Sequence, residues 1–240
     1  MISASTRELN CWIGSMCLRS VYDNRRVPEV SRFEFRGFAF PLILCYLYGR
    51  RFMRIILASA SPRRAELLSA AGFEFDVVPA DVDETPHENE EPKTYVLRVA
   101  RAKADQIIKL QSAQRVVLAA DTTVTVDGQV MGKPRDREDA ASMLRALSGV
   151  VHEVHTAVVM QRGGRRFEEV VTTRVRFQRL SDEEIAWYVG SGEPTGKAGA
   201  YGIQGRAARF IDRIEGSWSN VVGLPISTVY HLMTLMGNGD

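Results

Sequence analysis

The sequence has few of the side chains that form soft-metal cages or covalent crosslinks. Among its 240 residues there are four histidines and three cysteines, which leaves little material for a zinc site or a disulfide framework. The cysteines, Cys11, Cys17 and Cys45, all fall within the first 52 residues. Residues 53–240 therefore contain no cysteine nucleophile, and a reducing cytoplasm is the compartment that we expect.

A long hydrophobic run and a strong net charge are also absent. The apolar run Phe38–Tyr48 is shorter than the about 20 residues that a membrane-spanning helix needs. It also lies too far from Met1 to be part of a secretory signal. Because the net charge is only +2, the chain has no general basic field that attracts nucleic acid. We therefore expect neither a membrane nor a nucleic acid as a partner.

The charge composition changes near Met53. The first 52 residues contain eight arginines and no lysine, whereas acidic side chains slightly outnumber basic ones in the rest of the chain. We place a domain boundary at this change and expect residues 1–52 to be a poorly ordered extension. Residues 53–240 form the expected folded domain, which is long enough to bury a core of its own.

Strand-like and helix-like patterns alternate through residues 53–240. An apolar run at Ile55–Ala58 predicts a buried strand, and Ser61 followed by Pro62 predicts the start of a helix. Further along we expect a helix over 91–111, a strand over 116–120, a helix over 136–147, a hairpin around 163–164, a capping box at Ser181 and Glu184, a glycine-rich loop over 192–205, a strand over 208–214, a polar turn over 215–220 and a last helix after Pro225. This alternation, with hairpins inserted, predicts an α/β fold with a mixed sheet.

The turn from Ser59 to Arg64 concentrates hydroxyl groups and positive charge between the first strand and the first helix. A helix N-terminus presents unpaired N–H groups and about half a positive charge. Ser59 and Ser61 add hydroxyl groups to it. Arg63 and Arg64 add planar guanidinium groups that match phosphate oxygens. The turn fits a phosphate site as well as it fits an ordinary capped helix with two solvated arginines.

Two groups of carboxylates are candidates for a metal site or for acid–base chemistry. Asp81, Asp83 and Glu84 form either a solvated acidic loop or a set of oxygen ligands for Mg²⁺ or Mn²⁺. Asp121 follows five apolar residues, where we expect the end of a central strand. A carboxylate at such a position is costly unless it has a partner. It either holds a cation or activates water, or it bonds to the neighbouring threonine backbone.

Three lysines could meet an anionic ligand. Lys103 lies seven residues after Val96 on the apolar face of its expected helix, so its side chain can reach inward. Lys133 stands between a glycine and a proline, and Lys197 lies in the glycine-rich loop. An ammonium group suits the β- and γ-phosphates of a nucleotide, although a lone lysine is more often a solvated surface residue.

A series of short motifs follows one another along residues 53–240. They are ILASASPRRAELL (56–68), VDE (82–84), ARAKA (100–104), AADTTV (119–124), GKP (132–134), LSG (147–149) followed by His152 and Thr156, KAGAYGIQG (197–205) and NVVGLP (220–225). In these motifs and in their order, the chain resembles the Maf family of nucleoside triphosphate pyrophosphatases. The resemblance implies an elongated, mixed β-sheet with flanking helices and two lobes around a deep cleft, the Maf or ITPase-like fold.

The same resemblance implies a reaction and a set of site residues. Members of the family hydrolyse a nucleoside triphosphate to the monophosphate and pyrophosphate with a divalent cation, Mg²⁺ or Mn²⁺. Asp121 is the implied catalytic residue, which acts either as a base or through the metal, and Glu84 and Asp121 are the implied metal ligands. The implied phosphate-binding residues are Ser59, Arg64, Lys103 and Lys133, and the implied specificity residues are Arg63, Thr122 and Gln204. The AYGIQG motif resembles the branch that acts on dTTP and UTP, and a glutamine amide can pair with the O4 and N3 edge of a pyrimidine.

Some features stay open at this point. The dTTP/UTP branch usually has aspartate before the lysine of the loop, where this sequence has Gly196, and this difference puts the rigidity of the loop in question.

Modified pyrimidine nucleotides are further candidate substrates for such a house-cleaning enzyme. An alternative function is a nucleotide-binding regulator of cell division or septum formation with little catalysis. Members of the family can pair as homodimers, and the sequence does not decide whether this chain does.

Overall fold

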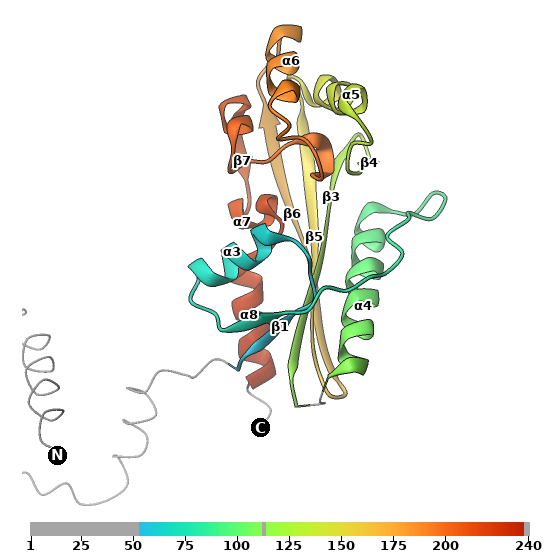
Figure 1. The fold of residues 1–240 in the computed structure, drawn as a ribbon, viewed down its shortest axis with the longest axis vertical. Helices are drawn as coiled ribbons and strands as arrows, with labels where there is room; N and C mark the ends of the chain where they lie inside the picture. Colours follow the sequence, from blue (N-terminus) through green and yellow to red (C-terminus); the bar gives the residue numbers. More distant parts are fainter. Residues whose placement is uncertain (1–52, 112–113, 238–240) are drawn as a thin grey trace, which may run out of the picture. The chain divides into compact units, whose positions relative to one another are not determined.

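A mixed β-sheet of seven strands runs through the part of the chain that the computed structural model describes, residues 53–111 and 114–237 (Figure 1). The strands are β1 (Ile55–Leu57), β2 (Phe75–Val77), β3 (Val116–Val126), β4 (Gln129–Met131), β5 (Val151–Arg162), β6 (Arg165–Phe177) and β7 (Ile211–Glu215). Their order in the sheet is β2-β1-β3-β5-β6-β7, and β4 pairs with the outer part of β3. The predicted extension over residues 1–52 lies outside the described residues.

Parallel and antiparallel pairing occur in different parts of this sheet. β1 runs parallel to both β2 and β3, whereas β3, β5, β6 and β7 form an antiparallel series. The long β5–β6 hairpin turns at Gly163, which has a φ of 56°, a value that glycine adopts without steric cost. The mixed sheet and the α/β class predicted from the sequence are therefore confirmed.

Helices cover both faces of the sheet. They are α3 (Pro62–Ala70), α4 (Pro92–Leu110), α5 (Arg137–Leu147), α6 (Asp182–Gly190), α7 (Trp218–Val222) and α8 (Ile226–Gly237). α4 packs Val96, Ala100 and Ile107 onto one face, while α3 and α8 pack onto the other face through a second core. α5 and α6 lie at the far end of the sheet, where they enclose a third core around Phe177 and Tyr188 (Figure 1).

β3 contributes residues to all three cores. Its residues up to Ala120 belong to the two cores at the parallel end of the sheet, and Val124 belongs to the core under α5 and α6. Asp121 therefore lies between two lobes, as the family resemblance implied. The expectation that Asp121 ends a strand is wrong, because β3 continues through it to Val126. β1 pairs with β3 only as far as Leu118, so the edge of β3 beside Asp121 is not covered by β1.

The sequence predictions were least accurate after the glycine-rich loop. The strand expected over 208–214 begins only at Ile211, after a 3₁₀ helix over Arg206–Phe210. The polar turn expected over 215–220 contains the start of α7, which Ser217 caps by accepting a hydrogen bond from the Asn220 N–H. A helix of five residues is too short to show a helical hydrophobic period. The capping box at Ser181 and Glu184 is confirmed.

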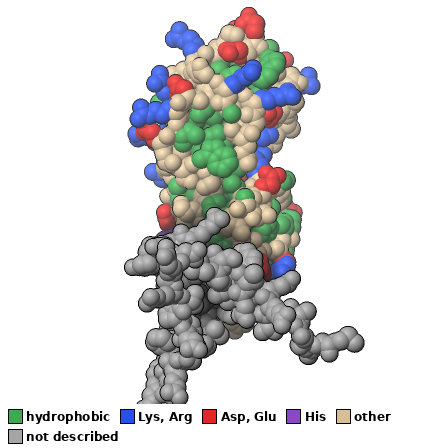
Figure 2. Space-filling model, turned by 90° about the vertical axis from the view of Figure 1, so that its left-hand side faces the viewer, with side chains coloured by type: hydrophobic (Ala, Val, Ile, Leu, Met, Phe, Trp, Pro, Cys, Tyr) green, Lys and Arg blue, Asp and Glu red, His purple; other side chains and the backbone are tan. Residues whose placement is uncertain are grey.

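The surface on the side of α3 and β7 is not uniform. Charged side chains gather towards the end where α6 lies, and hydrophobic side chains gather in the middle of this face (Figure 2). Trp187 and Trp218 are among the large hydrophobic residues of the described chain that remain exposed. Within the described residues, none of the helices has both the length and the apolar character needed to cross a membrane.

Candidate active site

A cavity of about 790 Å³ lies along β3 between the two lobes. Its volume is in the range that small-molecule ligands usually occupy. All the sequence-predicted site residues line it, namely Ser59, Arg63, Arg64, Glu84, Lys103, Asp121, Thr122, Lys133 and Gln204. They come from segments that are far apart in the chain, and the fold brings every one of them to this hollow.

The turn between β1 and α3 forms one wall of the cavity. Pro62 occupies the first position of α3 and Ser61 the N-cap position, as predicted. The hydroxyl oxygen of Ser59 accepts hydrogen bonds from the Ser61 N–H (3.2 Å) and from Nη1 of Arg64 (3.0 Å). These bonds fold the turn back on itself, and Ser61, Pro62 and Arg63 border the cavity.

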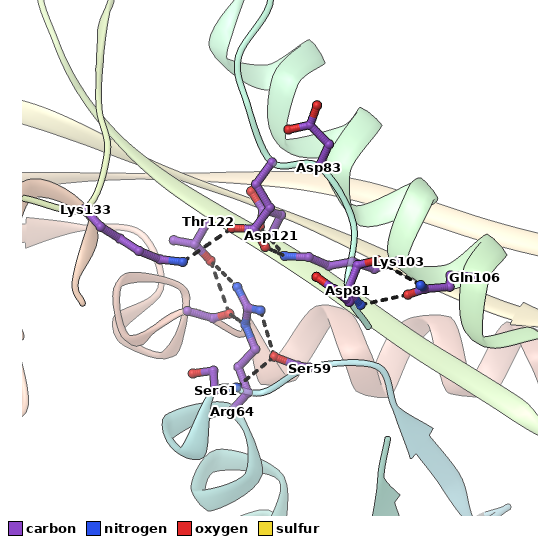
Figure 3. A network of polar contacts seen from close by, with 12 residues as sticks. Ser59, Ser61, Arg64, Asp81, Asp83, Lys103, Gln106, Asp121, Thr122 and Lys133 are labelled. Carbon is purple, nitrogen blue, oxygen red and sulfur yellow. Dashed lines mark hydrogen bonds and ion pairs between the residues drawn. The ribbon is translucent and has the colours of Figure 1, made fainter. Parts of the chain in front are cut away.

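Arg64 connects three segments of the chain at the wall of the cavity. It donates from Nε to the carbonyl oxygen of Gly223 (2.8 Å) and from Nη2 to Oγ1 of Thr122 (3.1 Å), in addition to its bond with Ser59 (Figure 3). The side chain is buried, and burial lowers the pKa of its guanidinium against the opposing effect of Asp121. Arg64 thus supports the site as a fixed scaffold, a role that its sequence position alone did not indicate.

Asp121 and Glu84 share the ammonium group of Lys103. Nζ of Lys103 lies 2.7 Å from Oδ1 of Asp121 and 2.5 Å from Oε1 of Glu84. Nζ of Lys133 lies 3.3 Å from the other oxygen of Glu84. In Figure 3 the two lysines approach Asp121 from opposite sides. Two carboxylates and two ammonium groups therefore converge on a single point of the cavity.

Burial separates the two carboxylates in character. The side chains of Asp121 and Lys103 are 9% and 8% exposed, whereas that of Glu84 is 38% exposed. Burial raises the pKa of Asp121, although Lys103 and Arg64 oppose this shift. For Glu84 burial also acts to raise the pKa, but the contacts with Lys103 and Lys133 outweigh it and the pKa is lowered. The pKa values of the two carboxylates are therefore shifted in opposite directions.

Glu84 reaches the cavity because α4 holds the loop that carries it. The hydroxyl of Tyr95 donates to the Glu84 carbonyl oxygen (2.9 Å), and Arg98 donates to the carbonyl oxygen of Thr85 (3.0 Å). The Asp83 carboxylate instead accepts the Thr85 N–H and points away from the cavity (Figure 3). Asp81 bonds through its backbone to Gln106. Of the three acidic residues in this loop, Glu84 is the one that lines the site.

Glu84 and Asp121 fit a hard divalent cation as a pair of oxygen ligands. Within residues 53–111 and 114–237, no group of three or more His, Cys, Asp and Glu side chains is placed to hold a metal ion. Mg²⁺ commonly takes one or two carboxylates from the protein and completes its shell with water and substrate phosphates. The two carboxylates lie close enough to contact one ammonium group, and their oxygens are the donor type that such a cation prefers.

The other end of the cavity is formed by Thr122 and the glycine-rich loop. Oγ1 of Thr122 accepts a hydrogen bond from Arg64 and lies 3.0 Å from Oγ1 of Thr156. Gln204 borders the cavity from an exposed position in the loop. Tyr201 and Lys197 lie beside it. Tyr201 also contacts the buried His152, with 2.8 Å between the Tyr201 hydroxyl oxygen and Nε2 of His152.

Sequence reasoning missed several residues that shape the cavity. Tyr95 and Gly223 were not singled out, and both line the site. Gly223 has a φ of 123°, so the NVVGLP motif needs glycine there for a backbone shape that other residues rarely adopt. The motif itself was the available signal, but the contact of its carbonyl with Arg64 spans 159 positions and leaves no local pattern.

Comparisons with known proteins agree with this description. The family profile described as Maf-like protein matches residues 54–236. A dTTP/UTP pyrophosphatase from Anaeromyxobacter dehalogenans (strain 2CP-C) is 53% identical over 188 residues, which are 77% of this chain and 94% of the relative. One of the same name from Geotalea uraniireducens (strain Rf4) is 51% identical over 186 residues, 76% of this chain and 95% of the relative.

A solved structure of a HAM1 protein from Coxiella burnetii is 17% identical, with a TM-score of 0.43, and the match covers 78% of this chain and 100% of that chain. The match to the family profile spans the described residues that line the cavity. Identity of about half over nearly the full length of the relatives settles the family: this chain belongs to the Maf family.

Proposed function

We propose that this protein is a nucleoside triphosphate pyrophosphatase that hydrolyses dTTP and UTP to the nucleoside monophosphate and pyrophosphate. The observation that carries the proposal is the convergence of the basic turn, Glu84 and Asp121 on one cavity. The names of the relatives, dTTP/UTP pyrophosphatase, support the same substrates. The family profile supports the assignment through its match to residues 54–236.

The charge of the cavity suits a triphosphate. Among the residues that the structure describes, five cationic side chains line it together with the carboxylates of Glu84 and Asp121: Arg63, Arg64, Lys103, Lys133 and Lys197. A nucleoside triphosphate brings about four negative charges, which such a preorganised set of cations can stabilise as charge shifts during reaction. The N-terminus of α3 adds backbone N–H groups to this set.

We assign to Asp121 the activation of the water molecule that attacks the α-phosphorus. The raised pKa of Asp121, caused by burial, suits a group that accepts a proton from water at neutral pH. Lys103 contacts the Asp121 carboxylate and fixes its orientation. Glu84 and Asp121 would hold the divalent cation, which supplies charge neutralisation to the phosphates when it is bound.

Base recognition is assigned to Arg63, Thr122 and Gln204. The Gln204 amide offers one donor and one acceptor, which match the O4 acceptor and N3–H donor of uracil and thymine. Cytosine has the reverse pattern at these two positions. Because Gln204 is exposed at the rim of the cavity, its amide is free of the buried ion pairs that surround Asp121.

The test is a panel of nucleoside triphosphates incubated with the full chain and Mg²⁺ or Mn²⁺. We expect equal amounts of pyrophosphate and monophosphate from dTTP and UTP, and much slower release from CTP and GTP. Pseudo-UTP and 5-methyl-UTP in the same panel measure the preference for modified pyrimidines. Tight binding of dTTP without release of pyrophosphate would instead support the regulatory alternative.

A further inference from the structure

The loop that carries Gln204 is held by a side chain outside the residues assigned so far. Glu193, in the turn after α6, is partly buried and accepts two hydrogen bonds with its carboxylate. Oε1 accepts from the Tyr188 hydroxyl at 2.9 Å, and Oε2 accepts from the Arg206 N–H at 2.9 Å. The Tyr188 oxygen in turn accepts the N–H of Gly202 at 3.2 Å. This chain of bonds fixes both ends of segment 202–206.

Gln204 is the middle residue of that segment. Its backbone therefore lies between two anchored positions. The Gly202 N–H is connected to Glu193 through the Tyr188 hydroxyl, and the Arg206 backbone N–H bonds to Glu193 directly. The hydroxyl of Tyr188 stays protonated over the working pH range, because burial and the bond to Glu193 raise its pKa. The hydroxyl therefore keeps both hydrogen bonds: it accepts from the Gly202 N–H and donates to the Glu193 carboxylate.

The glycines of the loop are shaped around the same carboxylate. A Cβ atom at Gly205 would lie 2.3 Å from Oε1 of Glu193, a distance that no real side chain tolerates. Lys197 closes the turn from the other side, since its ammonium group donates to the backbone carbonyl of Glu193. The Lys197 stem lies where a Cβ at Gly202 would be only 3.0 Å away. The backbone of this loop thus packs directly on Glu193 and Lys197.

We infer that Glu193 is a positioning residue for base selectivity, which holds the Gln204 segment in the geometry that recognises the pyrimidine edge. Glu193 does not line the cavity, so it acts through the loop and not through contact with the nucleotide. The inference rests on the proposed function, because it takes the pyrimidine nucleotides as substrates. It adds a residue and a bonding route that determine how Gln204 is presented.

The decisive variant is Glu193→Gln in the full chain, with Glu169→Gln as the matched control on exposed β6. A glutamine side chain has one acceptor oxygen in place of two. Either the Tyr188 hydroxyl or the Arg206 backbone N–H therefore loses its acceptor and faces the glutamine NH₂ group instead. We expect the preference for UTP over CTP, as a ratio of kcat/KM values, to fall roughly tenfold. The loss should appear in KM for UTP and dTTP, with kcat at saturation retained.

Hydrogen exchange provides a second measurement that needs no substrate. In Glu193→Gln the amides of residues 202–206 should exchange faster than in the wild type, and in Glu169→Gln they should not change. Unchanged exchange together with an unchanged UTP/CTP ratio would overturn the inference. So would an equal loss of kcat for every nucleotide, since that indicates a general structural role.

Tyr188→Phe tests the same hydrogen bonds if Glu193→Gln folds poorly. It removes the hydroxyl but keeps the ring, which packs edge-on against the Phe210 ring with 5.5 Å between the ring centroids. We expect the same direction of change in selectivity, and the double variant should lose little more than either single one. If the wild type released no pyrophosphate from dTTP or UTP, the proposed function would fail. The exchange data would still show whether Glu193 holds the loop.

Discussion

The two ends of the cavity are built in opposite ways. At the end around Asp121, the charged side chains of Asp121, Lys103 and Arg64 are buried, and each has a partner of opposite charge or a hydrogen bond. At the end around Gln204, the Gln204 side chain is exposed, and the Glu193 carboxylate holds the backbone of the glycine-rich loop through a hydrogen bond from the Arg206 backbone N–H. Changes at the first end should affect both folding and chemistry, whereas changes at the second end should affect selectivity alone.

The largest effect is expected at the buried end, on turnover. Asp121→Asn keeps the shape of the side chain but removes its capacity to accept a proton, so kcat with UTP should fall about 10²–10⁴-fold. Pyrophosphate release under saturating substrate measures it. Asp83→Asn is the control, because that carboxylate lies on the Glu84 loop outside the cavity. Near-normal turnover of Asp121→Asn would contradict the assignment.

Next comes a stability difference between the two lysines. Lys103→Ala leaves Asp121 buried without its ammonium partner, and the free energy of unfolding should drop by about 3 kcal/mol. Lys133→Ala removes an ammonium group whose side chain is 65% exposed, so its effect should stay below about 1 kcal/mol. Urea denaturation without nucleotide gives both values. Equal losses for the two variants would erase the distinction between buried and exposed charge.

A smaller effect is expected at the exposed end. Gln204→Glu replaces a donor by an acceptor, so the pairing with O4 of uracil is lost while a cytosine amino group gains an acceptor. The UTP/CTP ratio of kcat/KM should shift by roughly tenfold towards CTP. The urea midpoint should not move, because the side chain is exposed. An unchanged nucleotide profile would remove Gln204 from the recognition set.

The smallest effect concerns residues 1–52. The described residues that line the cavity fall between Ser59 and Gly223, so a chain that begins at Met53 retains them. We expect its kcat/KM for UTP and its urea midpoint to equal those of the full chain, measured side by side. Loss of folding or of hydrolysis in the shorter chain would show that the extension contributes to the domain.

The sequence was most informative where chemistry and local structure coincide. The turn at Ser59–Arg64 could be recognised because a strand, a proline at the first helical position and paired arginines lie within a few residues. Lys103 could be placed inward from its seven-residue spacing to Val96, and the structure confirms that it is buried. The further grouping of residues from the remaining segments relied on the ordered family motifs.

Long-range contacts could not be predicted in this way. The course of β3 through Asp121 depends on pairing with β5, which continues after β1 has ended. The hydrogen bond from the Arg206 backbone N–H to the Glu193 carboxylate spans a loop whose shape is set by glycines and not by a repeating pattern. The Gly196 position has a φ of 70°, which suits glycine and gives this departure from the family motif a backbone that accommodates it.

The bond between Arg64 and Gly223 has a consequence for how the protein is made. The guanidinium belongs to the first helix to be synthesised in the described domain, and its carbonyl acceptor follows 159 positions later. While Gly223 is still inside the ribosome, the hydrogen bond between Arg64 and the Gly223 carbonyl oxygen cannot form. The nascent protein should therefore remain unable to bind nucleotide until translation is nearly finished, however early its first strands have paired.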